Sequence, residues 1–253
     1  MAQGEPSLAA SADASFIQVE SRFFHRVFWA FAALAVLSLL ISLGGQKLGT
    51  RLSMGGHTDD RTLHEVVIGN DVLSASANQI RYPEQRRGGI ANRLDLYALW
   101  PDMEGFTEAT RAAFNNTAPG KKLLFLSFEP RTLSRDMSGR LDPIYRKMIS
   151  GDGQALSNGL FRYKLPESAG FIDEYLLVGA VSAGKMFVAR CLGDENAGSI
   201  LASCDRDIHV GDDLVMMTRF PSSLLADWKL LDASLDKFAG TIVKTTAASG
   251  QDD

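Results

Sequence analysis

The stretch VFWAFAALAVLSLLISL, residues Val27–Leu43, is an unbroken apolar run, with Arg26 before it and no further charge until Lys47. A helix rises about 1.5 Å per residue, so roughly 20 such residues cross a hydrocarbon layer of about 30 Å. Inside a bilayer, a single segment satisfies its backbone polar groups only as a helix. The run therefore predicts one transmembrane helix over residues 22–46, through which the chain contacts membrane lipid.

A cleaved signal peptide is the alternative interpretation of this run. Signal peptides have a short basic start, an apolar stretch of roughly 7 to 15 residues and a small-x-small cleavage site. Here the preceding segment is long and mixed in charge, the apolar run is longer, and Ser42-Leu43-Gly44 is only a weak cleavage site. We therefore favour an uncleaved signal anchor.

Small residues recur every three or four positions along one face of this helix, at Ala35, Ser38, Ser42 and Gly45. Small side chains let transmembrane helices approach closely, so this stripe is compatible with a homodimer formed through the membrane. The alternative is a chance pattern in a span rich in Ala and Ser.

The two cysteines of the chain, Cys191 and Cys204, orient the protein where the flanking charges do not. Basic residues lie on both sides of the apolar run, so the positive-inside rule gives no decision. A close pair of cysteines suits a disulfide between two strands, and disulfides persist in oxidising compartments. Two free thiols in the cytosol are the alternative. We expect a bacterial inner-membrane protein with its C-terminal domain in the periplasm.

Composition divides the chain into five parts. Residues 1–21 are small and polar and predict a disordered cytoplasmic tail, and residues 244–253 predict a second disordered tail. Glycines in residues 47–61 predict a flexible linker. Residues 62–243 are long enough for one domain with its own core. With 45% hydrophobic residues and a net charge of −4, nucleic acid is not an expected partner.

The 62–243 domain is expected to be a β-rich α+β domain of antiparallel strands with one long C-terminal amphipathic helix. Short apolar or alternating runs bounded by turn residues predict the strands 65–68, 72–73, 93–100, 122–128, 160–165, 174–181, 186–191 and 213–220. From Ser223, apolar residues recur every three or four positions as far as Ile242. This seam predicts packing on the domain's own sheet, with a coiled-coil contact to a partner as the alternative.

Three short patterns resemble catalytic or metal motifs without completing them. Ser182-x-x-Lys185 has the spacing used by penicillin-binding proteins, but it lies in a glycine-containing turn between two predicted strands. His64-Glu65 lacks the second histidine of a zinc protease motif, because Ile68 stands in its place. The acids around Asp205-x-Asp207 lack EF-hand spacing and are expected to form a solvated loop. We therefore predict no catalytic residue, no metal site and no cofactor.

The segment Arg81-Tyr82-Pro83-Glu84-Gln85-Arg86-Arg87, with Arg93 soon after, is the candidate binding site. Arginine forms charge-assisted hydrogen bonds with carboxylates and phosphates. Residues Arg81, Tyr82, Arg86, Arg87 and Arg93 are therefore expected to bind a protein or another anionic envelope partner, with a solvated loop as the alternative.

Three classes of function remain open at this level. The favoured one is a non-catalytic single-pass protein whose periplasmic domain binds another component of the cell envelope. The second is a subunit of a multi-protein membrane assembly. The third is an envelope hydrolase, since catalytic residues need not be close in sequence. This layout resembles that of single-pass envelope proteins of Gram-negative bacteria, which is a similarity of organisation and implies no activity.

Overall fold

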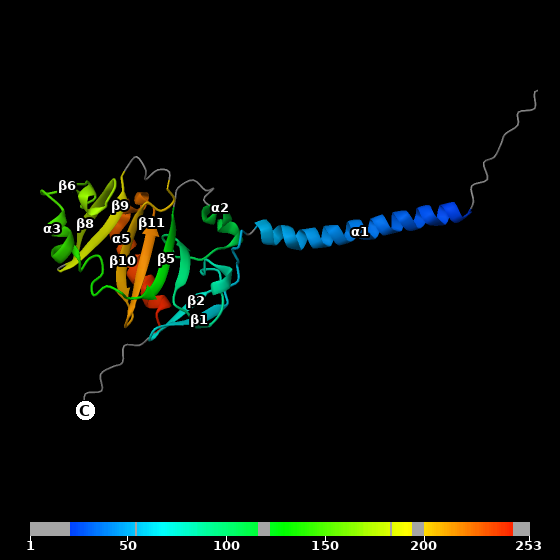
Figure 1. Ribbon diagram of the computed structural model, residues 1–253, viewed down its shortest axis with the longest axis horizontal. Coiled ribbons are helices and arrows are strands. Elements are labelled where there is room, and N and C mark those ends of the chain that lie inside the picture. The colour runs from blue at the N-terminus through cyan, green and yellow to red at the C-terminus, as the bar shows by residue number, and fades with distance from the viewer. Residues whose placement is uncertain (1–20, 54, 116–121, 183, 194–199, 245–253) are drawn as a thin grey trace, which may run out of the picture. The chain divides into compact units, whose positions relative to one another are not determined.

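A computed structural model describes residues 21–53, 55–115, 122–182, 184–193 and 200–244 of the chain. The chain divides into two compact units, residues Met1–Ser53 and Met54–Asp253 (Figure 1). Residues 1–20 and 245–253, which make up nearly all of the two predicted tails, lie outside the described residues.

The first unit contains one long helix, α1 (Ser21–Ser53). Its segment Arg22–Ile41 is a candidate membrane span of 20 residues with a mean hydropathy of 1.9, and none of it is buried within the protein. Ala35 and Ser38 of the small-residue stripe are exposed on this helix, whereas the side chains at positions 42 and 45 lie outside the described residues. Close packing through this stripe stays a prediction.

Helix α1 continues beyond residue 46, into the segment 47–61 that we expected to be a flexible linker. It ends at Ser53, and residues 55–62, before strand β1, are non-helical. The glycines at positions 44, 45 and 49 each disfavour a helix by about 1 kcal/mol relative to alanine. The intervening Gln46, Lys47 and Leu48 are good helix formers, and an existing helix adds residues more easily than a new one starts.

The second unit is built on an antiparallel sheet of eight strands in the order β4-β5-β11-β10-β9-β8-β7-β6. The strands are β4 (Leu94–Leu99), β5 (Leu123–Pro130), β6 (Gln154–Ala155), β7 (Phe161–Lys164), β8 (Glu174–Ser182), β9 (Lys185–Leu192), β10 (Cys204–Val210) and β11 (Leu214–Phe220). Short helical segments connect them, including α2 (Arg111–Phe114) and α3 (Arg146–Met148). The β-rich antiparallel domain expected from the sequence is confirmed.

A smaller sheet has the order β2-β1-β3, from β1 (Leu63–Ile68), β2 (Asp71–Ser76) and β3 (Gly89–Ile90). Its β1–β2 hairpin is fastened to the turn between β10 and β11. The buried Asp71 carboxylate accepts hydrogen bonds from the backbone N–H groups of Asp212 and Asp213, both at 3.0 Å. The adjacent Gly211 has a φ of 60°, and any side chain there would collide with Asp71. This turn therefore requires glycine.

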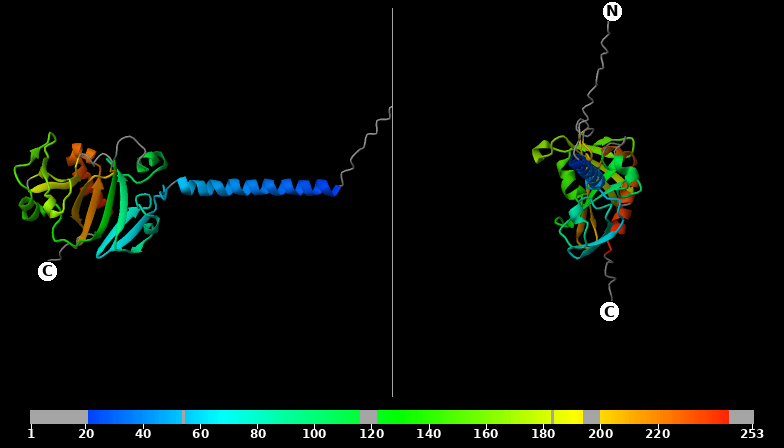
Figure 2. Two further views of the ribbon diagram at one scale, coloured as in Figure 1. Left: turned by 45° about the horizontal axis from the view of Figure 1, so that its top comes forward. Right: turned by 90° about the vertical axis from the view of Figure 1, so that its right-hand side faces the viewer.

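The C-terminal helix α5 (Trp228–Ile242) covers one face of the large sheet, as Figures 1 and 2 show, and follows a 3-10 segment over Ser222–Asp227. The expected apolar seam faces the domain's own core. Its buried members are Leu224, Trp228, Leu231, Leu235, Phe238 and Ile242. Packing on the domain's own sheet is confirmed, so this seam is not available for a coiled coil with a partner.

The core also contains an ion pair that joins α5 to the sheet. Arg206 and Asp232 are each 2% exposed, and the guanidinium Nη2 donates to the carboxylate of Asp232 at 2.7 Å. Lys185 Nζ lies 3.2 Å from the same carboxylate and also pairs with Asp236. The lysine of the Ser-x-x-Lys pattern is thus held by two carboxylates of α5, at the turn of a β-hairpin.

The expectation of a solvated acidic loop around Asp205 and Asp207 is wrong. Both residues lie in the fourth strand of the large sheet, β10, between β9 and β11. Cys204, Arg206 and Ile208 alternate toward α5, while the two aspartates point to the opposite face. The pattern was misread because a charged Arg206 occupies a core position, which interrupts the apolar alternation that identifies a strand.

Candidate binding site

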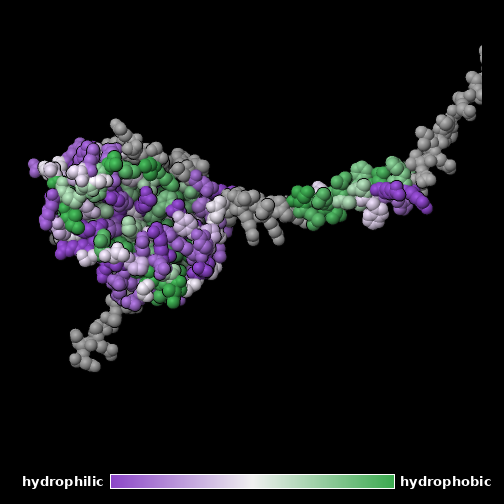
Figure 3. Space-filling view, in the orientation of Figure 1, coloured by the Kyte–Doolittle hydropathy of each residue, from purple (hydrophilic) through white to green (hydrophobic). Residues whose placement is uncertain are grey.

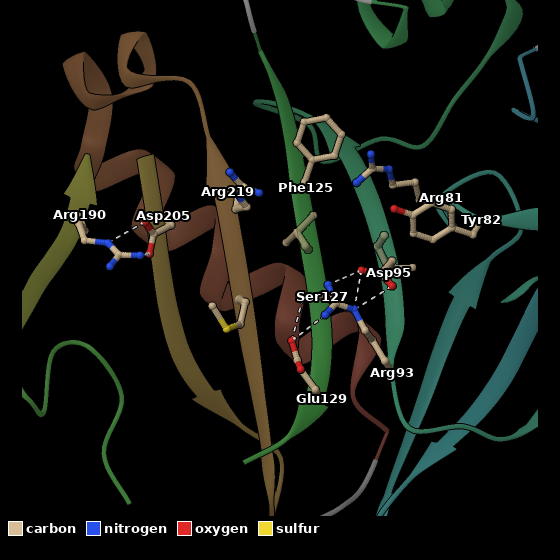
Figure 4. A pocket seen from close by; sticks show the side chains of 13 residues that line it. Arg81, Tyr82, Arg93, Asp95, Phe125, Ser127, Glu129, Arg190, Asp205 and Arg219 are labelled. Atoms are coloured by element: carbon tan, nitrogen blue, oxygen red, sulfur yellow. Dashed lines mark hydrogen bonds and ion pairs between the residues drawn. The ribbon is translucent and has the colours of Figure 1, made fainter. Parts of the chain in front are cut away.

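The face of the large sheet opposite α5 contains an open groove of about 470 Å³. In Figure 4 most of its side chains project from the near face of strands β4, β5, β11, β10 and β9, and α5 passes behind the sheet. Arg81, Tyr82 and Arg93 come from the segment that precedes β4. The groove is lined by Arg81, Tyr82, Arg93, Asp95, Leu96, Phe125, Leu126, Ser127, Glu129, Arg190, Asp205, Met217 and Arg219. Two smaller hollows, of about 170 and 150 Å³, adjoin it and share Arg190 and Asp205.

Strand alternation explains why this face is polar while the other is apolar. On β5, Leu124, Leu126 and Phe128 point into the core beneath α5 and are buried. The intervening Phe125, Ser127 and Glu129 therefore point to the groove, because successive side chains of a strand face opposite sides. On the face turned to the viewer in Figure 3, hydrophilic and hydrophobic residues are intermixed over the domain.

Two apolar clusters cover the ends of this sheet face and leave its middle open. At the β4 edge, Tyr97 and Leu123 pack with Phe106 and Phe114 of the segment that contains α2. Toward β8, Val178 and Val188 pack with a cluster that includes Tyr145, just before α3. The groove lies between these covers.

Strand register sets the order of side chains across the groove. Phe125, Arg219, Asp205 and Arg190 are successive cross-strand partners on β5, β11, β10 and β9. Neighbours in such a row lie about 5 Å apart at Cβ and interact directly. The row therefore brings the aromatic ring of β5 beside three charged groups of β11, β10 and β9, which lie much later in the sequence.

Most charges in the groove are already paired. Arg93 Nη2 lies 2.8 Å from Asp95, and its Nη1 lies 3.3 Å from Glu129. Arg190 Nε lies 3.1 Å from Asp205 and 3.2 Å from Glu174. The pKa of Arg93 is raised, chiefly by its hydrogen bond with Asp95. Burial alone would lower the pKa of Arg190, but the nearby carboxylates of Asp205 and Glu174 raise it by more. Arg93 and Arg190 are therefore both cationic.

Arg81 and Arg219, here called the arginine pair, differ from the others. In the part of the chain that the structure describes, neither guanidinium forms an ion pair with a carboxylate. The Arg81 guanidinium lies 4.7 Å from the centre of the Phe125 ring and 5.0 Å from that of Tyr82. Figure 4 shows the arginine pair on either side of Phe125. Two positive charges beside an aromatic ring are thus open to a ligand.

The structure separates the arginines that the sequence grouped together. Arg81, Tyr82 and Arg93 line the groove. Arg86 instead donates hydrogen bonds to the carbonyl oxygens of Gly56, at 2.6 Å, and Ile80, at 3.1 Å, so it stabilises its own loop. Arg87 is exposed and is not among the residues that line the groove. Binding by Arg86 and Arg87 therefore has no support in this geometry.

The cysteine pair forms a disulfide between β9 and β10, as expected. Cys191 and Cys204 are direct cross-strand partners. Arg190 precedes Cys191 and Asp205 follows Cys204, and these two charged residues are also cross-strand partners. The bond thus fastens together the two strands that carry the Arg190–Asp205 ion pair.

Ten of the residues that line the groove lie outside the predicted site, and four of these form the cross-strand row: Phe125, Arg190, Asp205 and Arg219. Each belongs to a predicted strand or to the misread β10, and each points away from α5. The available signal was the strand alternation itself, which places Arg219 and Arg190 on the faces of their strands opposite the buried Phe220 and Cys191.

Comparison with known proteins adds little to this description. No family model matches the chain, and no curated protein matches its sequence. Among solved structures, the chain is similar to an immunity protein of the Stenotrophomonas maltophilia type IV secretion system. The two share 15% identity with a TM-score of 0.49, over 76% of this chain and 98% of the other. At these values the likeness supports no functional argument.

Proposed function

We propose that this protein is a non-catalytic, single-pass inner-membrane protein whose periplasmic domain binds another component of the cell envelope through the groove. The open, charged groove on one face of the large sheet is the observation that carries the proposal. Sheet faces in compact domains are either packed or solvated, and this one is packed at both ends and hollow in between. A groove between two packed clusters suits a ligand that fills the uncovered middle of this sheet face.

The pairing of its polar groups favours binding over catalysis. Ser127 Oγ donates a hydrogen bond to Glu129 at 3.3 Å, which resembles a nucleophile beside a base. The same carboxylate oxygen also lies 3.3 Å from Arg93 Nη1, so it is already engaged in an ion pair within the groove. The contact therefore fits a positioning role.

The candidate span and the disulfide support the assigned location. An exposed apolar helix of this length is stable in a bilayer, and a disulfide persists where thiols are not kept reduced. A subunit of a larger membrane assembly is the second candidate. For that function α1 offers an unpacked apolar surface, whereas the seam of α5 is buried in its own domain.

Site-specific photo-cross-linking in intact cells tests the binding function. Met217 is 38% exposed and lines the groove, so a photo-reactive amino acid placed there should form an adduct with the partner. Leu230 is 53% exposed on α5, opposite the groove, and is the matched control. We expect an adduct from position 217 and none from position 230. Equal labelling, or none from position 217, would contradict the proposed groove function.

A further inference from the structure

We propose that the arginine pair, Arg81 and Arg219, binds a carboxylate side chain on an acidic segment of a protein partner, with Phe125 as the surface beneath it. This inference rests on the proposed function, since it names the partner of the same groove.

Charge balance within the groove identifies the ligand group. Asp95, Glu129 and Asp205 are already engaged by Arg93 and Arg190, so the groove's remaining open charges are the two guanidiniums. Asp205 is the cross-strand neighbour of Arg219, but it pairs with Arg190 instead. A planar guanidinium matches a carboxylate with two parallel hydrogen bonds. An incoming carboxylate would therefore meet donors that currently lack an ionic partner.

The signs of the lining charges argue against a polyanion. Asp95, Glu129 and Asp205 lie in the same groove as the arginine pair. A phosphate-rich polymer or an anionic membrane surface spreads negative charge over a wide area and would be repelled by these carboxylates. A ligand with one or two acidic groups, placed at the arginine pair, avoids this repulsion.

The remaining lining residues favour a protein over a small molecule. Small-molecule sites are lined mainly by apolar side chains, whereas charged residues dominate this groove. Tyr, Phe, Met and Arg are the residue types enriched at the centres of protein interfaces. Tyr82, Phe125, Met217 and the arginine pair supply all four types. The two adjoining hollows lengthen the recess, as a chain segment requires.

Titration of the full chain in detergent micelles tests this inference with defined probes. The first probe is a blocked synthetic peptide with two adjacent glutamates between glycines, the second is the same peptide with glutamines, and the third is inorganic phosphate. Binding is followed by the arginine Nε–Hε signals in the NMR spectrum. We expect the glutamate peptide to shift these signals, the glutamine peptide to leave them unchanged, and added salt to weaken the effect.

Two charge-matched double variants locate the binding. Arg81→Gln with Arg219→Gln removes the arginine pair and should weaken the glutamate peptide by at least about tenfold, the loss expected for charge-assisted hydrogen bonds. Arg61→Gln with Arg87→Gln removes two exposed arginines outside the groove and should change affinity by less than about twofold, as expected of surface charges. Circular dichroism verifies that both variants are folded.

The outcomes separate this inference from the proposed function. Equal losses in the two double variants, or phosphate binding as tightly as the glutamate peptide, would overturn the carboxylate-binding role. A failure of all probes together with an adduct at position 217 would overturn it too, and would leave the groove function standing. Peptide binding that depends on the arginine pair, without any adduct at position 217, would refute the proposed function and, with it, the assignment of a protein partner to the arginine pair.

Discussion

At the scale of single residues, the buried ion pair Arg206–Asp232 is an interaction that the local sequence does not predict. Both side chains are almost fully buried, and Arg206 also donates to the Val188 carbonyl at 3.1 Å and lies 4.5 Å above the Phe187 ring. Burial lowers the pKa of Arg206, which reflects the cost of placing a charge in the core. The carboxylate of Asp232 offsets this cost.

Removing one partner of this pair should therefore be much worse than removing both. Asp232→Ala leaves Arg206 buried and unpaired and should cost about 3–5 kcal/mol of unfolding free energy. Replacing both residues with apolar ones, as in Arg206→Met with Asp232→Leu, should restore most of this loss. Denaturant unfolding of the wild type and of these two variants measures both effects. A loss below about 1 kcal/mol for Asp232→Ala would show that water reaches the pair.

The surroundings of His57 predict that the free energy of unfolding depends on pH. Its ring stacks on Phe106 with centroids 4.8 Å apart, and its Nδ1 lies 2.9 Å from the Tyr97 hydroxyl. Burial, with Arg86 and Arg81 nearby, lowers its pKa from the usual 6.5. Below pH 6.5, His57 binds a proton more readily in the unfolded chain than in the folded chain. The free energy of unfolding therefore falls as the pH is lowered through this range.

Thermal melts between pH 7.5 and 5 check this expectation. The melting temperature should fall with pH more steeply in the wild type than in His57→Phe, which keeps the ring stacking and does not titrate. Parallel curves for the two proteins would remove His57 as a cause.

At the scale of elements, the orientation of α5 predicts that two neighbouring leucines differ in how much they stabilise the fold. Leu231 is 0% exposed in the core, whereas Leu230 is 53% exposed. Leu231→Ala should cost about 2–5 kcal/mol, and Leu230→Ala should stay within about 0.5 kcal/mol. Trp228→Ala should cost about 3–5 kcal/mol, because its ring packs on Phe187 and its indole N–H donates to the Asn158 carbonyl at 3.0 Å.

Thermal unfolding of the three variants in the full chain measures these losses. A domain of this size shifts by roughly 2–4 °C for each kcal/mol, so Trp228→Ala and Leu231→Ala should melt well below the wild type. Similar melting temperatures for the two leucine variants would refute the assigned orientation of the helix.

At the scale of the whole molecule, the prediction concerns topology. If the span is an uncleaved anchor, alkaline phosphatase fused after Asp253 should be active, and the same enzyme fused after Ser21, before the span, should be inactive. The disulfide should make Cys191 and Cys204 unreactive toward a maleimide until a reductant is added. Free thiols together with an inactive C-terminal fusion would reverse the orientation.

The sequence alone determined the features that depend on neighbours along the chain. The helix α1 is predictable from the length of its uncharged apolar run. The strands of the β1–β2 hairpin and the seam of α5 are predictable because side chains repeat every 2 residues in a strand and every 3.6 in a helix. Two cysteines leave a single intramolecular pairing, so the disulfide was predictable as well.

Only the tertiary structure decided which side chains meet in the groove. The strand order β4-β5-β11-β10 places Phe125 beside Arg219, and no local pattern encodes that neighbourhood. The same holds for Arg206. A charged side chain is expected at the surface, but here it is buried because Asp232 of α5 forms an ion pair with it. Local periodicity specifies which face of an element is apolar, whereas the partners across strands and helices depend on how the whole chain closes around its core.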